Sequence, residues 1–254
     1  MQPAGAPAIS VTELRKVYGD RAAVDGLTLS VPAGTFFGFL GPNGAGKTTT
    51  IRMLMGVVPP TSGSIEMLGM PLPECAIDIK RRTGLVPDDT LLFDRLTGSE
   101  YLEFAGRIYG LARPVARERA GELLALFELD GPNTRKLIAD YSKGMRKRVA
   151  MAAALIHRPD LFLLDEPFEG VDAVGARLMK DILLDQARHG ATIFLTSHVL
   201  EVVERLCDEV AILHEGRLVV QAPMAEFREG GETLEDAFVR IVGTSHTAEQ
   251  LDWL

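Results

Sequence analysis

A glycine-rich stretch that ends in a lysine and two threonines carries the residue types that phosphate chemistry needs. It fits the pattern G-x-x-x-x-G-K-[ST] in full. Glycines let successive backbone N–H groups turn inward around an anion, the amine of Lys47 reaches the outer phosphates, and the hydroxyl of Thr48 is placed to bind Mg²⁺. The residues assigned to the nucleotide are Gly41, Pro42, Asn43, Gly44, Ala45, Gly46, Lys47, Thr48 and Thr49. The stretch predicts a site for ATP or GTP, and the alternative of a turn that only joins a strand to a helix is disfavoured by the lysine and threonine.

Two neighbouring acids, Asp165 and Glu166, form the second candidate for chemistry. They follow the apolar run at 161–164, which predicts a buried strand. Parallel α/β sheets bind ligands at the carboxyl ends of their strands, where these acids fall. Phosphoryl transfer needs a carboxylate that anchors a metal ion and a group that orients water. The pair therefore suits hydrolysis better than the alternative of two solvated acids.

The elements expected around these residues form an α/β body. The aromatic and apolar run 35–40 predicts a strand before the glycine-rich loop, and 49–55 predicts a helix after it that ends at Gly56. Antiparallel strands are expected upstream at 9–12 and 26–31, whereas Pro71-Leu72-Pro73 predicts a break. Further strands are expected at 64–68, 83–87, 192–196, 209–213 and 217–221, and helices at 77–82, 172–189 and 199–206.

Helical periodicity dominates the middle of the chain, at 99–109, 114–127 and 143–156. It predicts a helical subdomain at about 91–158 that is inserted into the α/β body. We divide the chain into a disordered N-terminus at 1–8, an ATPase domain at 9–228, and a C-terminal helix and tail at 229–254. The tail is expected to fray at Trp253 and Leu254.

Composition and charge indicate a globular chain whose main partner is not nucleic acid. The chain has 254 residues, 46% of them apolar, and a formal net charge of -8, whereas binding to phosphate backbones needs concentrated lysine and arginine. Cys75 and Cys207 lack metal-ligand spacing and predict free thiols in a reducing compartment. Residues 1–7 lack the features of a signal peptide, and no apolar run approaches the roughly 18 residues of a membrane span. We expect a cytoplasmic chain.

Three further motifs complete a family pattern. They are Tyr-Ser-Lys-Gly-Met at 141–145, Gly-Val-Asp at 170–172 and Ser-His at 197–198. Together with the glycine-rich loop and the acidic pair, they stand in the order and at the distances of the ABC ATPases, and the chain resembles that family over roughly residues 9–240. The resemblance implies an α/β fold: a P-loop NTPase with an ABC-type ATPase core, an antiparallel β edge and an inserted α-helical subdomain.

The resemblance also implies catalytic roles, with ATP as substrate and Mg²⁺ as cofactor. Asp165 is similar to the Walker B aspartate that holds Mg²⁺, beside Thr48. Glu166 is similar to the general base that polarises the attacking water, and His198 to the switch histidine that contacts the γ-phosphate. Asp172 falls in the D-loop, which crosses to a second subunit.

Two further binding roles follow from the resemblance. Ser142, Lys143, Gly144 and Met145 are similar to the signature sequence, where a hydroxyl, backbone N–H groups and a helix N-terminus bind the γ-phosphate. Lys143 and Met145 depart from its usual glycine and glutamine, in a form familiar among exporters. Tyr18 takes the position that stacks on adenine, although a tyrosine beside a turn is by itself more often a packing residue.

A sharper departure is Asp88, which follows Pro87 where the family's Q-loop normally carries glutamine. Its carboxylate is a candidate Mg²⁺ ligand, but it adds negative charge to a site that already holds Asp165 and Glu166. Each like-charge pair at about 6 Å costs on the order of 3 kcal/mol unless the cation offsets it. After the signature, Arg146, Lys147 and Arg148 are interpreted as a solvated helix face.

The family resemblance predicts a transporter subunit. The stretches 95–102 and 233–238 are similar to exporter ATPases of the ABC-2 type, and 91–102 falls where transport members dock their membrane partner. We expect head-to-tail dimerisation with a second ATPase subunit, separate membrane-spanning permease subunits, and a peripheral place on the inner face of the cell membrane. The alternative is a soluble ABC ATPase that acts on nucleic acid or the ribosome. A kinase or GTPase would leave the signature unexplained.

Overall fold

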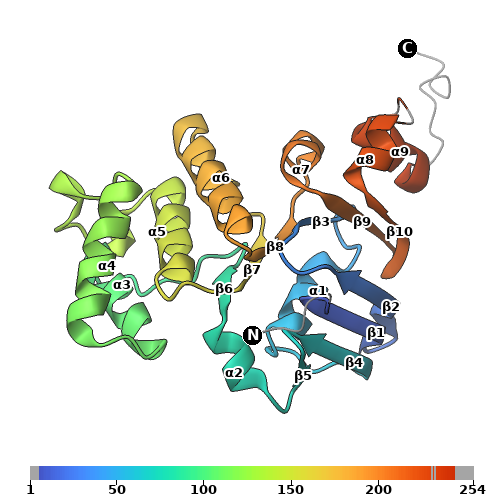
Figure 1. Cartoon of the computed structure of the whole chain (residues 1–254), viewed down its shortest axis with the longest axis horizontal. Coiled ribbons are helices and arrows are strands. Elements are labelled where there is room, and N and C mark those ends of the chain that lie inside the picture. Colours follow the sequence, from blue (N-terminus) through green and yellow to red (C-terminus); the bar gives the residue numbers. More distant parts are fainter. Residues whose placement is uncertain (1–5, 230, 232, 244–254) are drawn as a thin grey trace.

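The computed structural model describes residues 6–229, 231 and 233–243, and its elements form two β-sheets flanked by helices (Figure 1). The N-terminal sheet is antiparallel, with the strand order β2-β1-β4-β5. Its strands are β1 (Ile9–Tyr18), β2 (Arg21–Val31), β4 (Ser62–Met67) and β5 (Met70–Leu72). The expected antiparallel edge is therefore present, and its first two strands extend beyond their predicted bounds.

A second sheet of six strands, in the order β10-β9-β3-β8-β7-β6, passes through the centre of the molecule. Its strands are β3 (Phe36–Leu40), β6 (Thr83–Val86), β7 (Leu161–Asp165), β8 (Thr192–Thr196), β9 (Glu209–His214) and β10 (Arg217–Pro223). Neighbours from β9 to β6 are parallel. Every residue of β3, β7 and β8 is buried, as parallel strands covered on both faces require.

Alternation along these buried strands gives the sheet two hydrophobic cores. Phe36 and Phe162 face one core, whereas Phe37, Leu161 and Phe194 face the other. Successive side chains of a strand point to opposite faces, so each strand contributes to both cores. The rings of Phe37 and Phe194 stack with their centroids 5.7 Å apart. The carboxyl ends of these strands are therefore held from both faces of the sheet.

Helices flank the sheets and form a separate group at one end of the molecule (Figure 1). The α-helices are α1 (Lys47–Leu54), α2 (Ala76–Arg81), α3 (Gly98–Ile108), α4 (Arg113–Leu126), α5 (Lys143–Leu155), α6 (Ala173–Arg188), α7 (Leu200–Leu206), α8 (Met224–Glu229) and α9 (Leu234–Val242). Short 3₁₀ helices span Gly131–Asn133 and Ile138–Asp140. α3, α4 and α5 pack on one another, away from the N-terminal sheet. Thr97 and Glu100 start α3 with a capping box.

Two local predictions are wrong. The helix after the glycine-rich loop begins at Lys47 rather than at residue 49. The predicted break at Pro71 lies instead within β5, which pairs with β4 at the edge of its sheet. An edge strand tolerates proline because one of its sides makes no ladder hydrogen bonds.

Of the residues 1–8 predicted to be disordered, 1–5 lie outside the described residues, whereas Ala8 is buried and donates its N–H to the Val31 carbonyl at 2.8 Å. The fraying predicted at Trp253 and Leu254 lies outside the described residues. The short helices expected after Pro223 are present as α8 and α9. Within the part of the chain that the structure describes, no helix combines the length and apolar character needed to cross a membrane.

Candidate active site

The glycine-rich loop connects β3 to α1, and its backbone path requires glycine at two positions. A Cβ atom on Gly41 would lie 2.3 Å from the carbonyl oxygen of Leu213, and one on Gly46 would lie 2.4 Å from that of Ala23. Gly46 also has a φ of +108°, which L-residues rarely adopt. The loop therefore packs closely against its neighbours and turns its peptide groups in a way that side chains would prevent.

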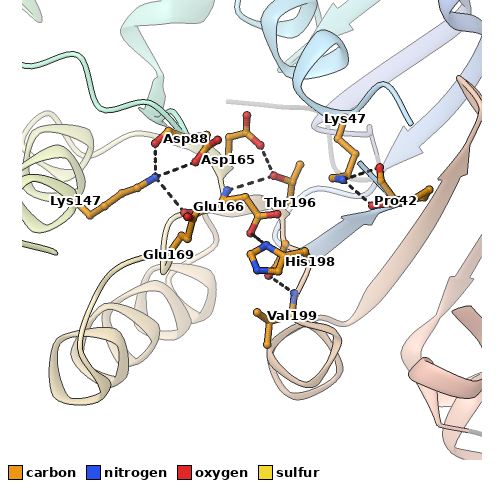
Figure 2. Close-up of polar contacts among 12 residues, drawn as sticks. Pro42, Lys47, Asp88, Lys147, Asp165, Glu166, Glu169, Thr196, His198 and Val199 are labelled. Atoms are coloured by element: carbon orange, nitrogen blue, oxygen red, sulfur yellow. Dashed lines mark hydrogen bonds and ion pairs between the residues drawn. The ribbon is translucent and has the colours of Figure 1, made fainter. Parts of the chain in front are cut away.

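Lys47 is the first residue of α1 and is buried within this loop. Its ammonium group donates hydrogen bonds to the carbonyl oxygens of Gly41 and Pro42 at 2.6 and 3.2 Å (Figure 2). Burial lowers the pKa of Lys47, while the nearby carboxylates of Glu166 and Asp165 act in the opposite direction. The loop thus holds a cation close to the acidic pair.

The hydroxyl residues after Lys47 differ in their surroundings. Thr48 is exposed, Thr49 is half-buried, and Thr50 is buried and donates a hydrogen bond to the Gly46 carbonyl at 3.0 Å. Thr48 is therefore the hydroxyl among these three that stands open to solvent at the start of the helix.

The acidic pair lies at the carboxyl end of β7, as predicted. Asp165 is buried and pairs in register with Thr196 of β8, whose hydroxyl donates a hydrogen bond to the Asp165 carboxylate. The next residue, Glu166, has a left-handed φ of +47° and donates its N–H to the Thr196 carbonyl at 3.2 Å. Thr196 thus fixes both acids, a contact that sequence analysis missed although the residue ends a predicted strand.

The Glu166 carboxylate faces His198, which follows the end of β8 (Figure 2). The Nδ1 atom of His198 lies 3.0 Å from Oε2 of Glu166. Burial raises the pKa of Glu166, and the contact with His198 opposes that shift. The side chain of Glu166 is 15% exposed and that of His198 is 58% exposed. A carboxylate with a raised pKa beside an imidazole is a suitable group to accept a proton from water.

The segment that resembles the signature begins α5. Ser142 caps this helix and accepts a hydrogen bond from the N–H of Met145 at 3.2 Å. Lys143 is exposed and forms an ion pair with Glu169 at 2.7 Å. Gly144 packs on the backbone of Gly170, where a Cβ would come within 2.9 Å of the carbonyl oxygen. The signature segment thus contacts the loop that leads to Asp172.

Asp172 caps α6 by accepting a hydrogen bond from the N–H of Gly175 at 2.9 Å. Its carboxylate is also paired with Arg148 at 3.4 Å, and its pKa is lowered mainly by the backbone hydrogen bond. Among the described residues, no hydrogen bond or ion pair joins the segment at 142–145 to the loop at 41–49. The structure therefore brings Lys47, Asp165, Glu166 and His198 together, and it holds Ser142 and Asp172 in a second group.

Tyr18 stands apart from the acidic pair, at the end of β1. Its side chain is 49% exposed, and the ammonium group of Lys16 lies 5.1 Å from the centre of its ring. One face of the N-terminal sheet thus presents an accessible aromatic ring.

The prediction of a solvated helix face at 146–148 is wrong. Lys147 is fully buried and donates hydrogen bonds to three backbone carbonyl groups. Arg146 and Arg148 are partly buried and also donate to carbonyl oxygens. The physical reason is that α5 packs between the sheet and the neighbouring helices. The three side chains therefore donate hydrogen bonds to backbone carbonyl groups of the adjacent segments.

Asp88 lies in the loop after β6, with its carboxylate 3.8 Å from the Lys147 ammonium group. Sequence analysis predicts an acidic cluster at this point, and the lysine reduces the repulsion in it. The burial of Lys147 was not predicted, although Gly144, Lys147 and Met151 lie on one buried face of α5.

The oxygen donors near the loop suit Mg²⁺. Thr48 offers a hydroxyl and Asp165 a carboxylate, and Mg²⁺ is commonly bound through one or two such groups together with substrate phosphates. The described residues contain no group of three or more acidic, histidine or cysteine side chains that would hold a metal by itself. Mg²⁺ would neutralise phosphate charge at this site.

Comparisons with known proteins agree with this architecture. A family model described as ABC transporter matches residues 24–169. The bacitracin transport ATP-binding protein BcrA of Bacillus licheniformis is 39% identical over 222 residues, which cover 87% of this chain and 71% of that protein. The Nod factor export ATP-binding protein I of Ralstonia nicotianae is 41% identical over 215 residues, which cover 85% of this chain and 67% of that protein. The structure of an ATP binding subunit of an ABC transporter matches with a TM-score of 0.86 and 30% identity, over 92% of this chain and 99% of that one.

The fold and the site define a P-loop ATPase, in which a glycine-rich loop and an acidic pair meet at the carboxyl edge of a parallel sheet. The chain belongs to the ABC transporter family. Within that family it is an ATP-binding and ATP-hydrolysing subunit, as the sequence predicts.

Proposed function

We propose that this chain powers an ABC-2 type exporter by hydrolysing ATP for separate membrane-spanning permease subunits. The observation that carries the proposal is the 41% identity to a protein named for Nod factor export, over 85% of this chain. The stretches at 95–102 and 233–238 add to it by their resemblance to exporter ATPases. In this function the chain is cytoplasmic and lies on the inner face of the membrane by binding the permease.

We propose distinct roles for the residues around the acidic pair. Lys47 and the N–H groups of its loop bind the phosphates of ATP, and Thr48 and Asp165 hold Mg²⁺. Glu166 accepts the proton of the attacking water, and His198 orients the Glu166 carboxylate and contacts the γ-phosphate. The 3.0 Å contact between these two side chains and the raised pKa of Glu166 support this assignment.

We propose that a second ATPase subunit completes the site. Ser142, Lys143, Gly144 and Met145 would bind the γ-phosphate held by the partner, and Asp172 would lie at the contact between the two chains. α1 and α5 stand on different sides of β6 and β7 in Figure 1, which supports binding across two chains rather than within one. Tyr18 would stack on adenine, and its exposed ring supports that role.

We propose that residues 91–158 act as the helical subdomain that contacts the permease. The mutual packing of α3, α4 and α5 supports treating this stretch as a unit. The residues at 1–8 and 229–254 are proposed to flank the ATPase domain at 9–228 without contributing to its site.

The proposed export function is tested by isolating the tagged chain from membranes of its source organism after detergent extraction. We expect a membrane-spanning protein to be recovered in a near equimolar ratio and to change the ATPase rate when it is reconstituted with the chain. The competing function would give a different result, because a soluble ATPase of this family that serves the ribosome or nucleic acid would be recovered with ribosomes or nucleic acid instead. That outcome would contradict the exporter assignment.

We propose that Asp88 helps to hold Mg²⁺. Asp88→Asn keeps the shape of the side chain and removes its charge, so it should raise the Mg²⁺ concentration that gives half-maximal hydrolysis. One charge-assisted contact is worth roughly 1.5–3 kcal/mol, which corresponds to an increase of about tenfold or more. The measurement is a titration of the ATPase rate against Mg²⁺ at saturating ATP.

The neighbouring variant Asp89→Asn is the matched control, because Asp89 is also an exposed carboxylate in the same loop. It should leave the half-maximal Mg²⁺ concentration within about twofold of the unchanged protein. Identical Mg²⁺ curves for Asp88→Asn and the unchanged protein would refute the metal role, and coupling to the permease would then be the function of this position.

A further inference from the structure

Lys147 lies in the second turn of α5, and its side chain reaches the residues that directly follow β6 and β7 (Figure 2). Its ammonium group donates hydrogen bonds to the carbonyl oxygens of Pro87, Asp88 and Glu166 at 3.1, 2.7 and 3.1 Å. The side chain is 0% exposed. One lysine thus connects α5, the loop after β6 and Glu166, which follows β7.

These contacts use the full donor capacity of the side chain. An ammonium group has three N–H donors, and three carbonyl oxygens accept them. A glutamine would offer two donors and a methionine none. Burial lowers the pKa of Lys147, while the carboxylates of Asp88 and Glu169 oppose that shift. A buried cation with these partners is a specific structural feature, because an unpaired one would be strongly destabilising.

The peptide group of Glu166 needs such support. Its φ of +47° lies in the left-handed region, which a non-glycine residue occupies stably where surrounding contacts fix it. The Glu166 N–H is held by the Thr196 carbonyl at 3.2 Å. The Glu166 carbonyl accepts hydrogen bonds from Lys147 and from the N–H of Glu169, the latter at 3.3 Å. Lys147 therefore fixes one side of the backbone turn from which the Glu166 carboxylate projects toward His198.

From this geometry we infer that Lys147 is a positioning residue for ATP hydrolysis, which holds the Glu166 backbone in place against α5 and the loop at Pro87 and Asp88. The inference rests on the proposed role of Glu166 as general base. Lys147 acts through the backbone of Glu166, whereas Lys47 and its loop bind the nucleotide separately. Because a shift of about 1 Å in a reacting group can lower a rate about 100-fold, loss of Lys147 affects turnover much more than ATP binding.

The test is the ATPase activity of the full chain carrying Lys147→Met, which preserves approximate side-chain length and removes all three donors. We expect kcat to fall about tenfold to hundredfold, while KM for ATP stays within about threefold. ATP affinity, measured with a fluorescent nucleotide, should also stay within about threefold. Because loss of folded protein would also lower kcat at unchanged KM, the stoichiometry of nucleotide binding must be measured as well. A lowered kcat at full binding stoichiometry is the result that a positioning defect produces.

Arg146→Met is the matched control on the adjacent position. Arg146 is a partly buried cation that donates to the carbonyl oxygens of Ile138 and Thr90 and pairs with Asp94, and none of these partners is Glu166. We expect this variant to keep kcat within about threefold of the unchanged protein, even if its melting temperature falls. An equal loss of kcat in both variants would overturn the inference, since the effect would then follow from a weakened α5.

A double variant tests whether Lys147 acts through Glu166. If it does, Glu166→Gln combined with Lys147→Met should have a single-turnover rate within about twofold of Glu166→Gln, because the group being positioned is already lost. A further loss of about tenfold in the double variant would show independent action and overturn the inference. Wild-type kcat in Lys147→Met would also overturn it.

Lys147→Gln provides a second variant if the methionine variant does not bind ATP. It retains two donors on a shorter side chain, so we expect a smaller loss of kcat at unchanged KM. Wild-type kcat in this variant would overturn the inference. The proposed role of Glu166 fails separately, through wild-type turnover in Glu166→Gln, whereas an inactive Glu166→Gln beside a fully active Lys147→Met contradicts the inference about Lys147 alone.

Discussion

Glu166→Gln is expected to lower kcat for ATP hydrolysis by at least about 100-fold while ATP affinity stays within about threefold. Glutamine keeps the shape of the side chain, and its amide cannot accept the proton of the attacking water. The phosphates are bound elsewhere, by the loop around Lys47. The measurement is the steady-state ATPase rate together with ATP affinity from a fluorescent nucleotide.

Glu169→Gln is the control for this result, because it lies three residues further along the same loop and pairs with Lys143 at the surface. An exposed ion pair contributes little, so we expect kcat within about threefold of the unchanged protein. Undiminished hydrolysis in Glu166→Gln would contradict the assignment of the general base.

The Glu166→Gln variant should accumulate the ATP-bound form, since hydrolysis no longer removes the nucleotide. If the signature segment binds a partner's γ-phosphate, ATP should then hold two chains together, which sedimentation or light scattering can detect. A strict monomer with bound ATP would contradict a homodimer and favour a heterodimer with another ATPase chain.

The pH dependence of turnover gives an independent measure of Glu166. A base must be deprotonated, and burial raises the pKa of this carboxyl above its ordinary value of 4.5. Turnover should therefore fall as the pH falls, with a midpoint above that value, and the residual rate of Glu166→Gln should lack this limb. An acid limb at or below pH 4.5 would mean that the base is not this buried glutamate.

The part of the site that sequence analysis predicts consists of residues at the ends of strands. β3 and β7 appear in the sequence as continuous apolar runs, because both of their faces are covered. The carboxyl ends of parallel strands meet at one edge of the sheet. The sequence therefore predicts that the glycine-rich loop and Asp165 lie close together. Thr196 also lies at the carboxyl end of a predicted strand, but no sequence motif marks its hydroxyl as part of the site.

Lys147 could not be predicted in the same way. A run of cations at the start of a helix usually faces solvent, and helix periodicity indicates which residues share a face but not what lies opposite. The Lys147 amine is buried because carbonyl groups from Pro87 and Glu166, which are far apart in the sequence, converge on it. The strand at Met70–Leu72 was missed for a related reason: proline is excluded from central strands, and the sequence does not reveal that this one lies at an edge.

Lys47→Ala is expected to remove measurable ATP hydrolysis and to weaken ATP binding about tenfold to hundredfold. A charged hydrogen bond to phosphate contributes roughly 1.5–3 kcal/mol to binding, and a cation that meets charge developing in the transition state contributes a further factor of about 100 to 1,000 in rate. The measurements are ATP affinity and single-turnover hydrolysis. Arg52→Ala is the control, because Arg52 is an exposed cation on the same helix, and it should change neither quantity by more than about threefold.

The loss in Lys47→Ala has two possible sources, and they can be separated. Lys47 donates to the carbonyl oxygens of Gly41 and Pro42, so alanine removes support for the loop as well as a charge. If loop support were the whole effect, the variant should lose thermal stability without nucleotide, and its weakened binding should be the same for AMP and ATP. If the charge on the outer phosphates dominates, AMP affinity should change by less than about threefold while ATP affinity falls by tenfold or more. Unchanged ATPase activity would contradict the nucleotide site itself, because a complete glycine-rich loop would then have no function for its lysine.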